Sequence, residues 1–188
     1  VKVKEYQDKL AKAKADGKFN AVGDVESDKK SAAKDCSFND AKDVFLSAFD
    51  FAGGDTPRVF VWKQKEKRIG TLIRAKDFAN HSLRTVFRTT TPPSKENYEL
   101  FICAQGDDSK EQGLPHQCRI AVTVNGNTVF SGPAPFVSSE WNLHCFKVRG
   151  AFLREGENIV TIDSLEEKGN FSGPPFFIFN YAVFKDVK

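Results

Sequence analysis

A nine-residue run near the end of the chain, Phe176–Phe184, constrains the fold more than any other segment. Its sequence, Phe-Phe-Ile-Phe-Asn-Tyr-Ala-Val-Phe, has apolar residues at both odd and even positions. Successive side chains of a β-strand point to opposite faces of its sheet, so a strand with this sequence has to be covered on both faces. Gly173-Pro174-Pro175 delays its start, because proline has no amide hydrogen for a strand ladder. We therefore predict a central strand.

Short runs of β-branched and aromatic residues, separated by turn signals, recur upstream of this strand. The 188 residues include 18 Phe against 3 Tyr and 2 Trp, which suits half-buried strands. The ten predicted strands are 44–51, 58–63, 69–73, 83–90, 98–104, 118–125, 128–130, 143–148, 158–163 and 176–184. Short strands at this frequency are typical of an all-β sandwich or barrel.

Some boundaries of these runs follow from the conformations of Asn, Gly and Pro. Asn125-Gly126-Asn127 separates Ile120–Val124 from Thr128–Phe130, and Asn and Gly tolerate the positive φ of a tight turn. We therefore predict a β-hairpin at this position. Pro92-Pro93 ends the run that begins at Leu83, for the same reason that proline delays the last strand.

The first 40 residues lack the strand pattern. Apolar residues at three- and four-residue spacing predict a weakly amphipathic helix over residues 2–16, ended near Gly17. They are Val3, Tyr6, Leu10 and Ala13. Residues 20–40 are rich in Asp, Lys, Ser, Ala and Gly, so we interpret them as a polar linker or surface arm. The predicted division is a helical arm with linker, 1–40, and a β-sandwich domain, 41–188.

Charge and hydropathy exclude two classes of partner. The chain has 28 Lys and Arg against 25 Asp and Glu, a formal net charge of only +3, which is not the strongly basic footprint of a nucleic-acid-binding protein. No stretch approaches the roughly 20 apolar residues that span a membrane, and the N-terminus has no signal-peptide pattern. The chain contains no Met, so we expect a processed product or a piece of a longer polypeptide.

The four cysteines leave the disulfide question open. Cys36, Cys103, Cys118 and Cys145 show no CxxC spacing, and four cysteines allow three connectivities. Cys103 and Cys118 flank one loop and are candidates for a bridge. Period-2 counting, however, puts Cys118 on the side of the apolar residues of its strand and Cys103 on the opposite side, so we expect these two thiols to face different sides of a sheet.

The stretch from Tyr98 to Phe184 has a recognisable order of elements. A strand with an Asn-Gly turn leads to a second strand, a segment with a Trp, and a short turn ending in Gly-Glu-Asn before another strand. The residues are Ile120–Gly126, Val129–Gly132, Trp141, Phe146–Val148 and Phe152–Ile162. In this order the chain resembles the galactose-binding-domain-like jelly rolls of carbohydrate-binding modules and accessory domains of polysaccharide-active enzymes. The resemblance implies an antiparallel β-sandwich (jelly roll), and a fold alone does not imply a function.

The sequence shows no convergent set of reactive groups. Its three histidines, His81, His116 and His144, are dispersed and form no zinc-binding set. It has neither a Gly-x-Ser-x-Gly elbow nor a phosphate-binding loop, and no spacing rule selects a carboxylate pair such as Asp107 with Glu140. We therefore expect no enzyme and no catalytic residue, with an unrecognised hydrolase as the last alternative.

Two tryptophans and an acidic loop supply the candidate ligand-binding residues. Sugars stack their CH faces on aromatic rings while their hydroxyls need directional hydrogen bonds. Trp141 and Trp62 are the candidate rings, and a core position is the alternative for each. Asp107 and Asp108, in the loop Gly106–Glu111, are the polar candidates. Members of the resembled family often hold a structural Ca²⁺, for which this loop offers oxygen ligands, and hydrated acids are the alternative because the EF-hand spacing is missing.

Together these features favour a non-catalytic carbohydrate-binding or accessory β-sandwich domain, part of or derived from a larger secreted protein. Its expected partner is a polysaccharide or another glycan, and its expected location is outside the cell or at the cell surface. The alternative is a structural or protein-interaction domain that contacts a neighbouring domain or a partner protein.

Overall fold

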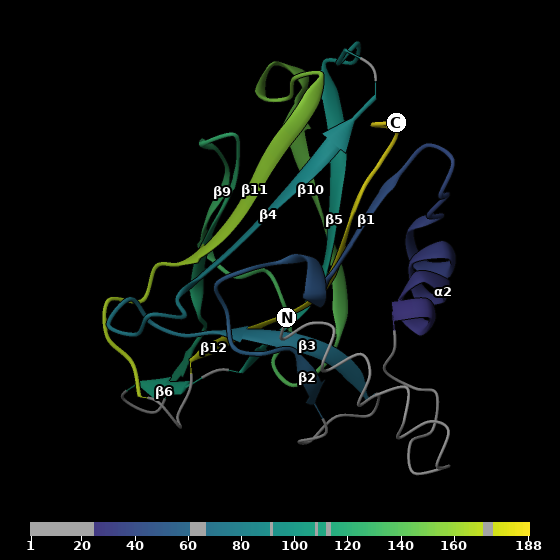
Figure 1. Cartoon of the computed structure of the whole chain (residues 1–188). Helices are drawn as coiled ribbons and strands as arrows, with labels where there is room; N and C mark the ends of the chain where they lie inside the picture. Colours follow the sequence, from purple (N-terminus) through teal and green to yellow (C-terminus); the bar gives the residue numbers. More distant parts are fainter. Residues whose placement is uncertain (1–24, 61–66, 91, 108, 112–113, 171–174) are drawn as a thin grey trace.

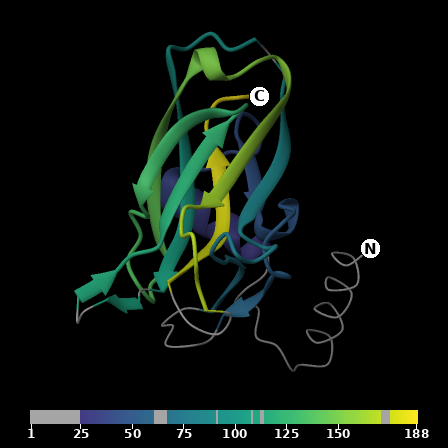
Figure 2. The ribbon, with the colours of Figure 1, turned by 90° about the vertical axis from the view of Figure 1, so that its left-hand side faces the viewer.

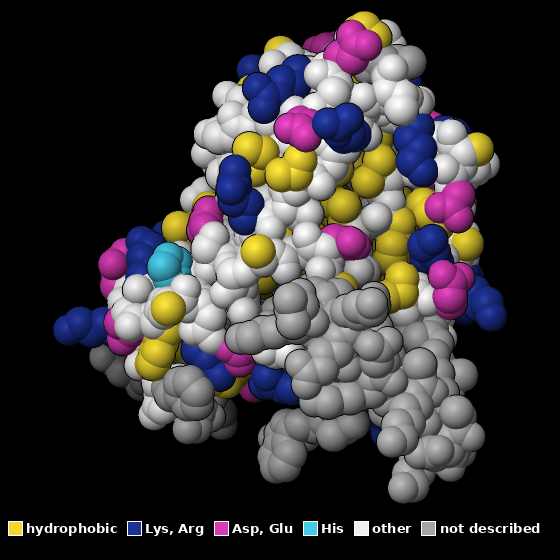
Figure 3. Space-filling view, in the orientation of Figure 1, with side chains coloured by type: hydrophobic (Ala, Val, Ile, Leu, Met, Phe, Trp, Pro, Cys, Tyr) yellow, Lys and Arg dark blue, Asp and Glu magenta, His cyan; other side chains and the backbone are white. Residues whose placement is uncertain are grey.

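Two antiparallel sheets pack face to face in the computed structural model, which describes residues 25–60, 67–90, 92–107, 109–111, 114–170 and 175–188 (Figure 1). The six-stranded sheet holds, in order, β10 (Asn142–Arg149), β5 (Asn97–Asp107), β12 (Phe176–Phe184), β3 (Arg68–Ile73) and β2 (Arg58–Phe60), with β1 (Val44–Ser47) also paired to β12. The four-stranded sheet holds, in order, β4 (Ser82–Thr89), β11 (Gly156–Ser164), β8 (Arg119–Val124) and β9 (Asn127–Pro133). Figure 3 shows hydrophobic side chains between the two sheets, with charged side chains around them. The predicted antiparallel β-sandwich is confirmed.

The last strand, β12, is central to the fold, as its sequence predicts. It pairs with β5 along one side, and on its other side with β3 near its start and β1 near its end. All nine of its residues are buried. In Figure 2 β12 (yellow) runs between strands of the four-stranded sheet in front and helix α2 (Val25–Cys36) behind. The strand is therefore covered on both faces.

A β-bulge at Asn180 explains why both parities of this strand are apolar. Phe179 pairs with Ala104 and Tyr181 with Cys103, so Asn180 is an extra residue on β12. A one-residue insertion moves every later side chain to the opposite face. The inter-sheet core therefore receives Phe177 and Phe179 before the bulge but Ala182 and Phe184 after it. The other face, which we call the outer face of the six-stranded sheet, receives Phe176, Ile178, Tyr181 and Val183.

Helix α2 contradicts the interpretation of residues 25–36 as part of a linker, and residues 20–24 lie outside the described residues. It covers part of the outer face, where Ala32 is fully buried beside Tyr181 and Val183. Asp28 is buried as well, and its carboxylate accepts a hydrogen bond of 3.0 Å from Asn180 Nδ2, which also donates to the Ile69 carbonyl at 2.7 Å. The sequence reads as a linker because only a narrow stripe of the helix touches the sheet. No helix of the described residues is long and apolar enough to span a membrane.

The other predicted elements can be compared with the structure strand by strand. Each of the ten predicted strands overlaps an observed strand, and the hairpin turn is confirmed, with positive φ at Asn125 and Gly126. The first strand ends early, because Ser47 and Asp50 form a capping box that starts the 3₁₀ turn η1 (Ala48–Asp50). A second 3₁₀ turn, η2, spans Gly150–Phe152.

The sequence missed one hairpin, β6 (Ser109–Glu111) with β7 (Leu114–His116), in the segment taken as a polar loop. The helix predicted over residues 2–16 lies outside the described residues, and the domain division at residue 41 stays a prediction.

All four cysteines are free thiols. Cys118 faces the inter-sheet core and Cys103 faces the outer face under α2, so the prediction that these two thiols point to different sides is confirmed. Burial raises the pKa of Cys103 to about 12 and that of Cys36 to about 11. Thiols with such pKa values are almost entirely protonated near neutral pH and react slowly with electrophiles.

Two adjacent alanines in α2 test whether the helix is part of the folded domain. Ala32→Glu places a charge against Tyr181 and Val183, and we expect it to lower the free energy of unfolding by about 3 kcal/mol or more. Ala33 is exposed, so Ala33→Glu makes the same change of residue with an expected effect within about 0.5 kcal/mol. Urea denaturation measures both, and equal effects would show that α2 is not docked in solution.

The thiols provide a second test of burial. Burial also raises the pKa of Cys145, but this thiol is only partly buried, so we expect iodoacetamide to modify it first in the native protein. Cys103, with a pKa of about 12, is expected to react only after unfolding in urea. Peptide mass spectrometry without reductant measures both steps. Rapid native modification of Cys103, or any cysteine that stays blocked after unfolding, would contradict the expectation.

Candidate functional site

A groove of about 180 Å³ opens on the outer face of the six-stranded sheet, at the end where β12 begins. Strands β2, β3, β5 and β12 and the loop before β10 all contribute to it. Its lining residues are Arg58, Phe60, Leu72, Gln105, Gly106, Asp107, Ser139, Phe176 and Ile178. We call it the outer-face groove. It combines aromatic and aliphatic side chains with an amide, a carboxylate, a hydroxyl and a guanidinium.

Strand register builds the floor of this groove. Leu72 of β3 pairs with Ile178 of β12, which in turn pairs with Gln105 of β5. Residues paired across neighbouring strands point to the same face, so these three side chains form one row. Phe176 and Asp107 are paired in the same way and form the next row. The floor is therefore assembled from three strands that are distant in sequence.

The Phe60 ring, on edge strand β2, forms an aromatic wall and is held between two other groups. The ring of Trp141 meets it edge-on, with 6.4 Å between ring centroids, and the Arg58 guanidinium lies 4.8 Å from its centroid. Trp141 also packs over Gly70 of β3, where an added Cβ would lie 3.0 Å from Trp141 Cη2. Trp141 is partly buried and is not among the lining residues, so it supports the wall from behind.

Asp55 anchors the guanidinium groups beside the groove. Its carboxylate accepts hydrogen bonds from Arg74 Nη2 at 2.9 Å and from Arg58 Nη1 at 3.4 Å. The Arg74 guanidinium lies 5.5 Å from the centroid of the Phe176 ring. Arg74 is buried, whereas about half of the Arg58 side chain is exposed. Arg58 therefore remains accessible at the rim while its position is fixed.

The loop before β10 closes the groove on the side of β5. The amide of Gly106 donates to the Val137 carbonyl at 3.1 Å, and the amide of Ser139 donates to the Gly106 carbonyl at 3.0 Å. Ser139 has φ +61°, a left-handed conformation that costs a residue other than glycine about 1 kcal/mol or more. The loop keeps this conformation while it places Ser139 beside Asp107 in the groove lining.

Gln105 is the polar residue at the floor. Its side chain is only 1% exposed, and its Oε1 atom has no hydrogen-bond partner among the described residues. More than about 90% of buried polar groups in proteins are paired, and a buried acceptor without a partner costs about 1–3 kcal/mol.

The sequence candidates fall partly within this region. Asp107 lines the groove and Trp141 supports its aromatic wall. Trp62 and Asp108 lie outside the described residues. The described residues contain no group of three or more His, Cys, Asp or Glu side chains that could hold a metal ion.

Sequence reasoning missed most of the groove, including Arg58, Phe60, Gln105 and Phe176. Period-2 counting along β5 places Gln105 and Asp107 on one face. Because Asp107 was a candidate from the sequence, this counting could also have identified Gln105. Nothing local points to Phe60, because a short run with alternating apolar residues does not reveal which strand lies beside it.

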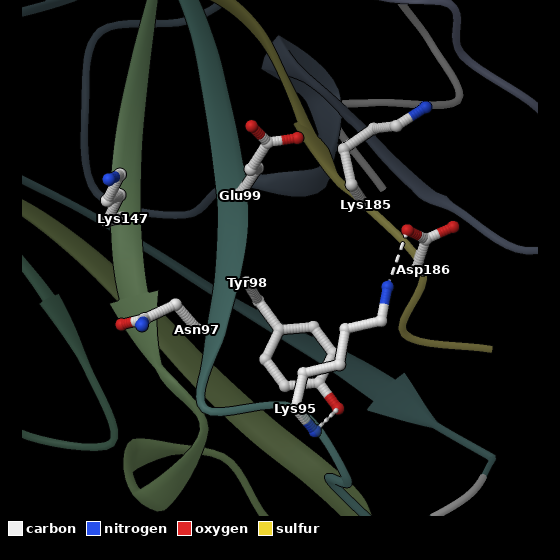
Figure 4. A pocket seen from close by; sticks show the side chains of 7 residues that line it. All are labelled: Lys95, Asn97, Tyr98, Glu99, Lys147, Lys185 and Asp186. Carbon is white, nitrogen blue, oxygen red and sulfur yellow. Dashed lines mark hydrogen bonds and ion pairs between the residues drawn. The ribbon is translucent and has the colours of Figure 1, made fainter.

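A second hollow, of about 300 Å³, lies on the six-stranded sheet near the C-terminus (Figure 4). Three of its charged groups already have partners: Lys95 Nζ lies 2.7 Å from Asp186, and Lys185 Nζ lies 2.6 Å from Asp43. The Tyr98 hydroxyl accepts hydrogen bonds from two backbone amides, and the Tyr98 residue is only 6% exposed. This hollow offers no accessible ring, so the outer-face groove is the better candidate site.

Comparisons with known proteins found similarity to solved structures. No family model and no curated protein matches the chain. A family 35 carbohydrate-binding module from Clostridium thermocellum matches with a TM-score of 0.47 and 14% identity, over 76% of this chain and 96% of that one. Carbohydrate-binding module CBM36, solved with calcium and xylotriose, gives 0.46 and 9%, over 76% and 99%. An exo-β-1,3-galactanase from Phanerochaete chrysosporium gives 0.46 and 13%, over 76% of this chain and 29% of the enzyme.

The supporting role of Trp141 leads to a stability prediction. Trp141→Ala removes the contacts with Phe60 and Gly70, and we expect it to lower the free energy of unfolding by about 2–3 kcal/mol. Val137, four positions earlier, is 55% exposed, so Val137→Ala should change it by less than about 0.5 kcal/mol. Urea denaturation of the two variants tests this difference. A Trp141→Ala variant as stable as the wild type would mean that the ring stands free of the sheet.

Proposed function

We propose that the chain is a non-catalytic carbohydrate-binding domain and that the outer-face groove binds one sugar unit of a polysaccharide. The observation that carries the proposal is the composition of the groove: an aromatic wall and an aliphatic floor beside Arg58, Gln105, Asp107 and Ser139. A pyranose ring presents apolar CH groups on its faces and hydroxyls around its edge. The CH face would lie against Phe60, and the hydroxyls would meet the amide, carboxylate and guanidinium.

The size of the groove supports a single sugar unit. Its 180 Å³ is below the roughly 300–1,000 Å³ of sites for drug-sized ligands. That space suits one ring of a chain whose other units extend into solvent.

The number of carboxylates in the groove fits a binding site better than a hydrolytic site. Glycoside hydrolysis commonly uses two carboxylates that flank the scissile bond. Asp107 is the one carboxylate among the described residues that line the groove. We therefore propose a binding or accessory role.

With a polysaccharide as the ligand, we also propose that the protein is located outside the cell or at the cell surface. Disulfides are favoured in such oxidising compartments, whereas all four cysteines here are free. Burial offers a physical reason why thiols could persist there, because it raises the pKa of Cys36 and Cys103 and so suppresses the reactive thiolate.

Affinity electrophoresis in gels that contain plant, algal or host polysaccharides tests the proposal. We expect at least one polysaccharide to retard the wild type and Phe60→Ala to weaken that binding about tenfold or more, because loss of about 1.4 kcal/mol of ring contact is a factor of ten. Val86→Ala is the control, since Val86 is 49% exposed on β4 of the opposite sheet and should leave binding unchanged.

Two results would count against this function. One is a wild type that no polysaccharide retards, and the other is a Phe60→Ala variant that binds as the wild type does. Repeating the gels with added Ca²⁺ and with a chelator shows whether the calcium implied by the family resemblance takes part in binding.

A further inference from the structure

We infer that Gln105 determines the specificity of the outer-face groove by selecting a sugar unit with a free hydroxyl at the groove floor. This inference rests on the proposed carbohydrate-binding function. It names the ligand class more closely: a glycan unit that is unsubstituted at one ring position, as opposed to its deoxy, O-methylated or O-acetylated form.

The surroundings of Gln105 carry the inference. Its strand partner Ile178 and the next residue of that row, Leu72, are buried aliphatic residues. Trp141 lies one position before the β10 residue that pairs with Ala104, the residue before Gln105. An aliphatic side chain at position 105 would continue this row without any polar group to satisfy. The chain instead places an amide there, with its Oε1 unpaired among the described residues, at the floor of an open groove. A hydrogen-bond partner supplied by a ligand would explain both the amide at this position and its unpaired oxygen.

The chemistry of an amide specifies what this partner must be. A glutamine side chain has one acceptor oxygen and one NH₂ donor, and half a turn about its last torsion exchanges them at the same place. A sugar hydroxyl both donates and accepts, so it satisfies the amide in either orientation. A methyl ether can only accept a hydrogen bond, from the NH₂ group, and it needs more room, whereas a deoxy position offers neither a donor nor an acceptor.

The depth of the amide explains why it would discriminate more strongly than the groups at the rim. Arg58 is about half exposed, and Asp107 and Ser139 are only partly buried, so water can replace a missing ligand group beside them. Gln105 is 1% exposed, so almost no water reaches its amide, and without a ligand hydroxyl the amide stays unpaired. Sites built to bond a hydroxyl reject the analogue that lacks it for this reason.

The test uses the methyl glycosides of glucose, galactose, mannose and xylose, with their monodeoxy and mono-O-methyl analogues. Calorimetric titration or saturation-transfer NMR measures their affinities for the wild type, Gln105→Leu and Gln105→Glu. We expect one ring position at which deoxygenation weakens binding to the wild type about tenfold to a hundredfold. The affinity of Gln105→Leu for the parent glycoside should be lower than that of the wild type by the same factor. This variant should bind the deoxy analogue as well as it binds the parent. Gln105→Glu, which keeps the acceptor oxygens, should keep the preference for the hydroxyl.

A stability measurement separates this role from a structural one. An unpaired buried amide contributes nothing to folding, so Gln105→Leu should be at least as stable as the wild type in urea denaturation. A clear loss of stability in Gln105→Leu would show that the amide already has a protein partner and would overturn the inference.

The outcomes also separate the inference from the proposed function. If no glycoside or polysaccharide binds the wild type, both fail. If a glycoside binds and Phe60→Ala abolishes its binding, while Gln105→Leu still prefers the parent over its deoxy analogue, the function stands and the role of Gln105 is overturned.

Discussion

The bulge at Asn180 is the constraint on which the rest of the structure depends. β12 lies at the centre of the six-stranded sheet, and one extra residue exchanges its two faces halfway along. A bulge leaves a backbone kink and an unpaired residue, and here the side chain of that residue is used as well. Asn180 donates to the Ile69 carbonyl on β3 and to the carboxylate of Asp28 on α2. One buried amide thus ties together the central strand, its neighbour and the covering helix.

The outer face is consequently divided into two parts with different roles. After the bulge, Tyr181 and Val183 are covered by helix α2 through Ala32. Before the bulge, Phe176 and Ile178 lie under the open groove. The helix completes the fold over one half of the strand, and the other half is left as an apolar floor on which a ligand can rest. The site of the proposed function is therefore a direct product of how the core is built.

The groove owes its shape to contacts that fix its walls from outside. Trp141 and Arg58 hold the Phe60 ring from two directions, and Asp55 holds both Arg58 and Arg74. The described part of edge strand β2 is the short segment Arg58–Phe60, and these side-chain contacts add to the backbone bonds that position it. A wall that is fixed before the ligand arrives loses less entropy on binding, which favours affinity in a small site.

The sequence by itself determined the strands, the Asn125-Gly126 hairpin and the central place of Phe176–Phe184, because alternation of apolar residues and turn chemistry act between near neighbours. It also pointed to Asp107 and Trp141, which lie at the groove. Only the tertiary structure decided that α2 is a docked helix, since Asp28 gains its partner Asn180 from 152 residues away. Only strand order and register brought Phe60, Gln105 and Ile178 to one groove, because pairings between distant segments leave no trace in any local pattern.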